Sequence, residues 1–278
     1  MTMAFEPILG TTESEDETVV DTVVVVGADL EPDDVAADVA ADAEIEVIES
    51  IVVDGDIETP LGEVDITLNV CFCTGTQIAT KRGLVAVESL MVGDMVLTLD
   101  NGYCPIRWIN GRALSKRDLA LNPKLLPVRI TAGALGNGTP VSDLMVSRQH
   151  RVLVTSAIVE RMFDTNEVLI PAIKLCGLDG IEQVTDATEV GYWHILFDRH
   201  EVVFSNGLAT ESLFTGPEAL KSLPFESREE IVSLFPEISN LDYAPTPARQ
   251  ICEKGSVIKQ LISRHKKNGR ILESRHPE

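Results

Sequence analysis

The sequence predicts a mainly β protein, with an all-β domain over residues 71–216 between two different flanks. Short β-branched runs separated by turn residues fill 71–216. The charge changes abruptly at the start of this region, which follows an acidic segment, 1–70. Helical periodicity is nearly absent between 71 and 216 and appears in the basic C-terminal region, 217–278, where Pro and Gly mark the boundaries of short helices. These three observations predict three consecutive parts.

The first part is distinguished by its acidity. Residues 1–70 contain 20 Asp and Glu and no Lys or Arg, whereas residues 71–278 contain 24 acids and 23 bases. The polar composition of residues 1–18 is typical of disorder. Three later stretches are strand-like: Val19–Val26, Glu44–Val53 and Glu63–Asn69. The segment is therefore either a small β unit or mostly disordered. Asp54 and Asp56 favour a hairpin turn over a calcium site.

The composition also excludes several classes of function. The acidity of the first part argues against a nucleic-acid partner. No apolar run reaches the roughly 18–20 residues of a membrane span. The first 16 residues lack the basic and apolar regions of a secretory signal, which leaves the cytoplasm or secretion without a cleavable N-terminal signal. The five cysteines show no CxxC pair and no Cys/His zinc spacing, so we expect no disulfide scaffold, metal ion or cofactor.

The middle part is predicted as a series of short strands. The candidates are Gln77–Thr80, Leu84–Val87, Met95–Leu99, Ile106–Ile109, Val128–Thr131, Val152–Thr155, Val168–Ile170, His194–Phe197 and Val202–Phe204. Asp100-Asn101-Gly102 predicts a hairpin turn that returns through Ile106–Ile109. Leu90 and Asp94 are echoed by Leu175 and Asp179, a spacing that two similar half-domains or chance would produce.

The third part is predicted to hold two helices. Ser227 and Glu230 form a capping-box pattern, and the helix they open should end near Phe235, before Pro236. A second helix is expected over Ser256–Lys267, with the apolar stripe Val257, Ile258, Leu261 and Ile262. Residues 248–278 hold 8 bases against 3 acids, which indicates a solvated helix face or a contact with an anionic partner.

Three local features could carry chemistry. Cys71 stands at the charge boundary and is followed by Phe72 and Gly75-Thr76. Ser147 precedes His150 by three residues at the start of an apolar strand. The stretch Tyr192–Gly207 brings His194, Asp198 and His200 into two short strands. An isolated cysteine is more often a small buried hydrophobic residue than a nucleophile. Cys71 is therefore a candidate nucleophile only because of the charge boundary and the neighbouring motifs.

In order and in local sequence, the three features resemble the motifs of the Hint superfamily, the Hedgehog/intein self-processing domains. Cys71-Phe72 is similar to the first motif, Ser147-x-x-His150 to the Thr-x-x-His motif, and Phe204-Ser205-Asn206-Gly207-Leu208 to the Phe-Ala-Asn-Gly-Ile of the last intein motif. The similarity is strongest to a bacterial intein-like branch and covers roughly 71–216. It implies a bacterial protein with a Hint-type all-β horseshoe of two pseudo-two-fold halves.

The resemblance implies a single-turnover autoprocessing reaction on the chain's own N-terminal segment. Cys71 would attack the carbonyl of Val70, and the resulting thioester would pass to water, an amine or a thiol. The family motif gives His150 the role of proton donor to the leaving amide and gives Ser147 that of holding the scissile peptide. His194 stands where inteins often carry Asp. We expect His194, Asp198 and His200 to matter, if at all, for turnover of the thioester.

Departures from the family pattern leave other functions open. Glu211-Ser212 replaces the His-Asn pair of splicing inteins, so no protein splicing is expected. A catalytically silent Hint-fold module for interaction or export is the main alternative, and a conventional cysteine hydrolase acting on other molecules is the third. Cys73 is the rival nucleophile. The remaining cysteines, at 104, 176 and 252, are interpreted as structural.

Overall fold

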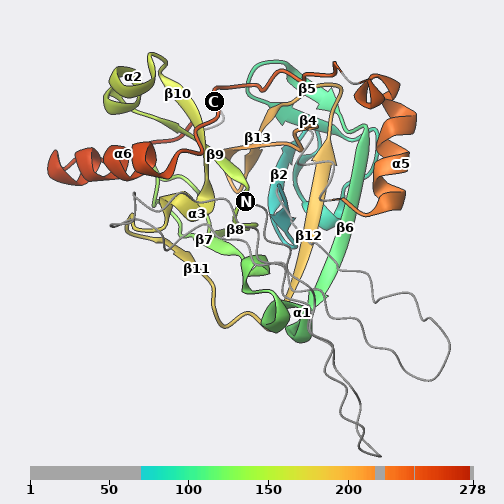
Figure 1. Cartoon of the computed structure of the whole chain (residues 1–278), viewed down its shortest axis with the longest axis horizontal. Coiled ribbons are helices and arrows are strands. Elements are labelled where there is room, and N and C mark those ends of the chain that lie inside the picture. The colour runs from blue at the N-terminus through green and yellow to red at the C-terminus, as the bar shows by residue number, and fades with distance from the viewer. Residues whose placement is uncertain (1–69, 217–222, 241, 276–278) are drawn as a thin grey trace, which may run out of the picture. The chain divides into compact units, whose positions relative to one another are not determined.

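The computed structural model describes residues 70–216, 223–240 and 242–275, all within one compact unit, Asp65–Glu278. This unit is mainly β, with two antiparallel sheets and a few short helices (Figure 1). The fold class predicted from the sequence is therefore confirmed. The strands and the Asp54-to-Asp56 turn predicted within the acidic segment lie outside the described residues.

The first sheet places the start of the domain between two strands that come much later in the chain. Its strand order is β11-β7-β8-β1-β12-β6. The strands are β1 (Phe72–Cys73), β6 (Trp108–Ser115), β7 (Val128–Ile130), β8 (Leu144–Val146), β11 (Ile181–Gln183) and β12 (Glu189–Leu196). Because β1 pairs with β8 on one side and β12 on the other, residues next to Cys71 are fixed by two distant segments.

The second sheet has eight strands, in the order β10-β9-β14-β13-β2-β4-β5, with β3 paired to β2 and a further pairing of β13 with β4. They are β2 (Gln77–Thr80), β3 (Gly83–Ala86), β4 (Met95–Thr98), β5 (Gly102–Pro105), β9 (Arg151–Thr155), β10 (Glu167–Pro171), β13 (Val202–Ser205) and β14 (Leu208–Glu211). Apolar residues from both sheets join in the main core, for example Val146 from the first and Ile78 from the second. Burying this apolar surface stabilises the arrangement of the two sheets.

The strand predictions were largely right, and one pairing was wrong. Every predicted strand in 71–216 overlaps an observed one. The partner of β4 is not Ile106–Ile109, however, but β5, whose Pro105 lies opposite Met95. Ile106 and Arg107 leave the hairpin, and β6 pairs with β12 in the other sheet. The turn residues predicted the position of the hairpin correctly. They did not indicate where the second strand ends, because this depends on where the chain crosses to the other sheet.

Short helices in the middle part were missed. They are α1 (Lys116–Leu121), α2 (Ala157–Phe163), α3 (Ala172–Leu175) and the 3₁₀ turns η1 (Val87–Ser89) and η2 (Pro123–Leu125). None is long enough to show a clear helical period. The caps were nevertheless readable, since Ser115 and Asp118 form a capping box at α1 and Ser156 accepts two backbone N–H groups at α2.

After residue 216 the chain forms α5 (Phe225–Leu234), η3 (Pro236–Ser239) and α6 (Gly255–Lys267). The predicted end of the first helix is confirmed, but Ser227 is not its cap. Ser227 lies inside α5, where its Oγ accepts a hydrogen bond from Asn110, and Glu230 accepts one from Trp108 Nε1 at 2.7 Å. Both side chains bind β6, beside which α5 lies (Figure 1), so tertiary contacts override the local capping pattern.

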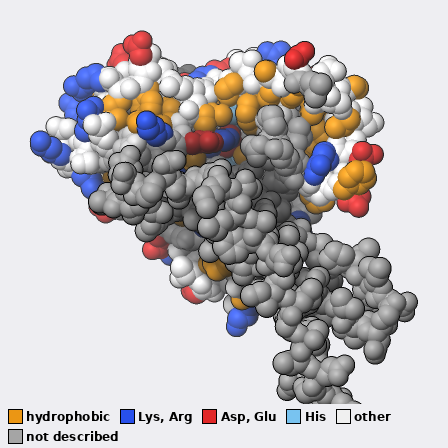
Figure 2. All heavy atoms as spheres, in the orientation of Figure 1, with side chains coloured by type: hydrophobic (Ala, Val, Ile, Leu, Met, Phe, Trp, Pro, Cys, Tyr) orange, Lys and Arg blue, Asp and Glu red, His pale blue; other side chains and the backbone are white. Residues whose placement is uncertain are grey.

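The predicted second helix is α6, and its apolar stripe joins the main core through Ile258 and Leu261. It packs against α2 and α3, which makes the C-terminal part integral to the described unit. Lys and Arg side chains gather on the side of the molecule where α6 lies (Figure 2). Within the described ranges, no helix is long and apolar enough to cross a membrane.

Candidate autoprocessing site

Strand register explains which side chains surround Cys71. Phe72 of β1 lies opposite Trp193 of β12 and opposite Val146 of β8. One step back along β1 and one step forward along each antiparallel neighbour therefore brings His194 and Ser147 to the two sides of Cys71. Sheet pairing thus unites three residues that are 76 and 123 positions apart in the chain.

His194 contacts both groups that would react. Its Nδ1 lies 2.7 Å from the carbonyl oxygen of Val70, and its Nε2 lies 3.3 Å from Cys71 Sγ. Because a carbonyl oxygen can only accept a hydrogen bond, Nδ1 carries the ring proton and donates the hydrogen bond. In the neutral ring, Nε2 is then free to accept from the thiol. One imidazole can thus polarise the Val70 carbonyl and receive the Cys71 proton.

Ser147 holds the other side of the same peptide. The backbone N–H of Cys71 donates to Ser147 Oγ at 3.0 Å, and the backbone N–H of Ser147 donates to the Cys71 carbonyl oxygen at 3.0 Å. Ser147, Cys71 and Val70 are all buried. The Val70–Cys71 peptide is consequently fixed from both faces and shielded from water, as preorganised chemistry requires.

His150 lies beside this group, and its ring forms no hydrogen bond with the thiol. Its backbone N–H closes a turn onto the Ser147 carbonyl at 3.1 Å, and its ring meets the edge of Phe72 with centroids 4.5 Å apart. The residue is fully buried, and neither ring nitrogen has a hydrogen-bond partner in the described part of the chain. An unsatisfied buried polar group costs roughly 1–3 kcal/mol, which is more typical of a functional side chain than of a structural one.

Burial dominates the electrostatics of all three titratable groups. It raises the pKa of the Cys71 thiol well above the usual value, with the nearby Cys73 adding to the effect and the Ser147 hydroxyl opposing it. It lowers the pKa of His194 to about 4, against the opposing effect of the Val70 carbonyl. It also lowers the pKa of His150 to about 4, against Glu211 and the backbone of Cys71. At neutral pH the site therefore holds a neutral thiol and neutral imidazoles.

Glu211 is a neighbour that the sequence reasoning did not recognise as part of this environment. It ends β14 with no exposed surface, and its carboxylate accepts from Arg151 Nη1 at 2.9 Å and from the Arg151 backbone N–H at 2.8 Å. Burial raises its pKa, but His200 and Arg151 outweigh this and hold the pKa below its usual value. The carboxylate thus stays charged and favours a proton on His150.

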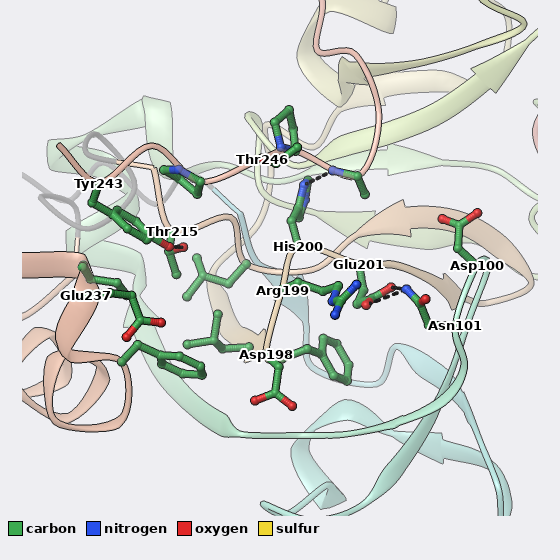
Figure 3. Close-up of a pocket in the computed structure, with 18 residues that line it drawn as sticks. Asp100, Asn101, Asp198, Arg199, His200, Glu201, Thr215, Glu237, Tyr243 and Thr246 are labelled. Atoms are coloured by element: carbon green, nitrogen blue, oxygen red, sulfur yellow. Dashed lines mark hydrogen bonds between the residues drawn. The ribbon is translucent and has the colours of Figure 1, made fainter. Parts of the chain in front are cut away.

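The structure does not bring Asp198 or His200 to the Val70–Cys71 peptide. Asp198 is exposed and lies 3.5 Å from Arg107. His200 is buried, with Nε2 3.3 Å from Glu211 Oε2 and Nδ1 accepting from the backbone N–H of Ala248 at 3.0 Å. Both line a separate pocket (Figure 3). Of the predicted histidines, it is His194 that contacts the thiol, which moves its expected role from thioester turnover to the first step.

All five cysteines are free thiols. Among the described residues, no cluster of three His, Cys, Asp or Glu side chains is arranged to hold a metal ion. Cys73 is buried near Cys71 and burial strongly raises its pKa, but the thiol that lies within hydrogen-bond distance of His194 is that of Cys71. The contacts described above therefore single out Cys71 among the thiols.

Lowered histidine pKa values predict a pH-dependent stability. The unfolded chain protonates His150 and His194 near pH 6.5, whereas the folded chain does so only near pH 4. The free energy of unfolding is therefore at its full value above pH 6.5 and decreases as the pH falls toward 4, by about 3 kcal/mol for each imidazole. Urea unfolding of the Cys71→Ala variant at pH 7 and pH 4.5 measures this loss.

Replacing His150 with Phe supplies the control for this prediction. The phenyl ring occupies a similar volume and does not titrate, so His150→Phe should remove about half of the acid-induced loss. An equal loss with and without this substitution would contradict the assignment of the pH dependence to His150.

The comparisons with known proteins identify the family. The family model described as Hint domain matches residues 70–217, just over half of the chain, and the chain therefore belongs to the Hint domain family. Similar solved structures include the gp41-1 intein, at 14% identity over 50% of this chain and 97% of that chain, with a TM-score of 0.30. The bacterial intein-like domain from Clostridium thermocellum is 15% identical over 51% and 98%, with a TM-score of 0.31. The MchDnaB-1 intein is 11% identical over 51% and 98%, with a TM-score of 0.32. No curated protein matches the chain.

Proposed function

We propose that this chain breaks its own Val70–Cys71 peptide bond through a thioester and releases or transfers the acidic segment 1–70. The Hint fold supports self-processing in general. The observation that carries the specific proposal is the double contact of His194, at 2.7 Å to the Val70 carbonyl oxygen and 3.3 Å to Cys71 Sγ. These are the two groups between which the new carbon–sulfur bond would form. Residues 71–216 are then the processing domain.

In the first step the thiol adds to the carbonyl. Cys71 Sγ bonds to the Val70 carbonyl carbon, and the thiol proton moves to His194 Nε2. A buried thiol with a raised pKa needs such a base, because little thiolate exists at neutral pH. The developing oxyanion is stabilised by the proton that His194 Nδ1 already donates to this oxygen. The ring becomes an imidazolium as the oxyanion forms, so the opposite charges arise side by side.

In the second step the Val70–Cys71 carbon–nitrogen bond breaks, and the amide nitrogen leaves as an amine. It must gain a proton. The hydroxyl of Ser147, 3.0 Å from this nitrogen, is within reach to relay one. His150 is the proposed source. Only the small fraction of His150 that is protonated at neutral pH can donate; Glu211 stabilises this form, and burial disfavours it. His194 returns to solvent the proton that it took from the thiol, so no net proton is consumed.

The proposal predicts fragmentation of the full-length protein by nucleophiles that capture thioesters. Incubation with dithiothreitol or hydroxylamine at pH 7 should yield the fragments 1–70 and 71–278. Intact-mass spectrometry over hours to days measures both. A chain that stays whole with either reagent, while circular dichroism shows it folded, would instead support the catalytically silent module.

A second prediction concerns splicing. Inteins release their C-terminal flank by Asn cyclisation, but Glu211 and Ser212 occupy the corresponding positions here. Ser212 is also used structurally, since its Oγ accepts from the backbone N–H of Glu201 at 2.9 Å. No product joining residues 1–70 to residues after 212 should form. Detection of such a fusion by peptide mapping would overturn this prediction.

A further inference from the structure

A pocket of about 560 Å³ lies at one end of β12 (Figure 3). This volume is within the range of small-molecule sites. The pocket is formed by the β4–β5 turn, the end of β12 with the turn into β13, the residues that follow β14, η3, and the linker from Tyr243 to Ala248. Nothing in the reaction described above uses it.

The pocket adjoins the residue whose carbonyl would be attacked. Leu196 and Leu213 line the pocket and also pack with Val70 and Trp108 in one buried cluster. Leu196 follows His194 by two residues on β12, so both side chains point to the same face of the strand, about 7 Å apart. Phe235 and Ile238 extend the same cluster into the pocket. A molecule bound there would contact side chains that pack directly against the acyl residue.

The lining combines an apolar base with negative charge. Apolar side chains occupy the middle of the view in Figure 3, and labelled polar residues surround them. Four of these carry carboxylates: Asp100, Asp198, Glu201 and Glu237. Arg199 is the one Lys or Arg among the described residues of the lining. Asp100 and Asp198 are paired with arginines, but within the described residues Glu237 forms no ion pair. Such a lining favours a cation with an apolar body over an anion or a neutral polar molecule.

We infer that this pocket binds the acyl acceptor, and that the acceptor is a primary amine with an apolar body. This inference rests on the proposed function, because it needs the Cys71 thioester. The ammonium group first loses one proton to solvent near the carboxylates. The amine nitrogen then bonds to the Val70 carbonyl carbon as the carbon–sulfur bond breaks, and its second proton passes to the Cys71 thiolate. The products are an amide at Val70 and the free thiol.

The test uses 2-phenylethylamine as the probe, with methylamine and 2-phenylethanol as comparators. Full-length protein is incubated with each at pH 8, and mass spectrometry quantifies the 1–70 fragment carrying the added group. Product formation should saturate with 2-phenylethylamine and exceed that with methylamine at least tenfold at equal concentration of free amine. The neutral alcohol should give less than a tenth of the amine product.

Two pairs of variants test the location. Thr246→Trp places a large side chain in the pocket, whereas Ala244→Trp changes an exposed position of the same linker that does not line it. Glu237→Gln removes a lining carboxylate, and Glu226→Gln removes an exposed one on α5 outside the pocket. The ratio of amine product to dithiothreitol-released fragment should fall at least fivefold in the first member of each pair and stay unchanged in the second.

The dithiothreitol arm separates the two possible failures. If the wild-type chain does not fragment with dithiothreitol, the proposed function fails and this inference fails with it. The acceptor pocket alone is refuted if the chain fragments with dithiothreitol but the phenylethylamine product behaves in one of three ways. These are a linear rise with amine concentration, equality with the methylamine product, and no change on Thr246→Trp substitution. Saturation that Thr246→Trp abolishes and Ala244→Trp preserves would support it.

Discussion

The Cys71→Ala variant should remain a single chain of 278 residues under conditions in which dithiothreitol divides the wild-type protein. The loss of cleavage should be complete, because Cys71 supplies the thiol that is hydrogen-bonded to His194 beside the Val70 carbonyl. Without Sγ no covalent intermediate forms, and an amide bond is stable in water over the length of the experiment. Intact-mass spectrometry after incubation measures the fraction cleaved.

Cys73→Ala is a closely matched control. Cys73 lies two residues further along the chain, at the end of β1, and packs in the same buried cluster as Cys71, so both substitutions remove one sulfur from one environment. Their costs in folding stability should be similar, while Cys73→Ala should keep most of the wild-type fragmentation. An active Cys71→Ala and an inactive Cys73→Ala would mean that the nucleophile is two residues further along the chain than proposed.

Some features of the structure could be predicted from the sequence and others could not. The sequence identified strands such as Gln77–Thr80, because alternation and β-branching are local properties. It also predicted α6, whose apolar stripe covers about two turns. It misassigned Ser227 and Glu230 as a cap, because their partners, Asn110 and Trp108 respectively, belong to a strand more than a hundred residues earlier.

The candidate site divides in the same way. Residue types and local motifs were enough to select Cys71, Ser147, His150 and His194 as candidates. They could not rank the histidines, because the contact of His194 with the thiol arises from the pairing of β1 with β12. Nor could they place Glu211 near His150, since this follows from how β14 lies against β9. Register and sheet order are nonlocal, and no single motif encodes them.

That geometry predicts the second large effect, a loss of roughly 10²–10⁴-fold in the rate of thioester formation in His194→Gln. The glutamine amide can still donate to the Val70 carbonyl oxygen, but it cannot accept the thiol proton. The buried thiol, whose pKa is raised, then has no base in contact with it. The measurement is the initial rate of appearance of the 1–70 fragment in excess dithiothreitol, which captures each thioester as it forms.

His265→Gln is the matched control, because it replaces another buried histidine, which contacts Ser156 and the Leu261 carbonyl on α6, far along the chain from Cys71. It should leave the initial rate within about twofold of the wild type. His150→Gln should slow the reaction through the leaving amide, and its residual rate should rise as the pH is lowered, because solvent can then supply the missing proton. The residual rate of His194→Gln should not rise on acidification, because acid cannot replace a base. If instead His194→Gln fragments at the wild-type rate, the 3.3 Å contact is structural, and His150 is left as the histidine of the first step.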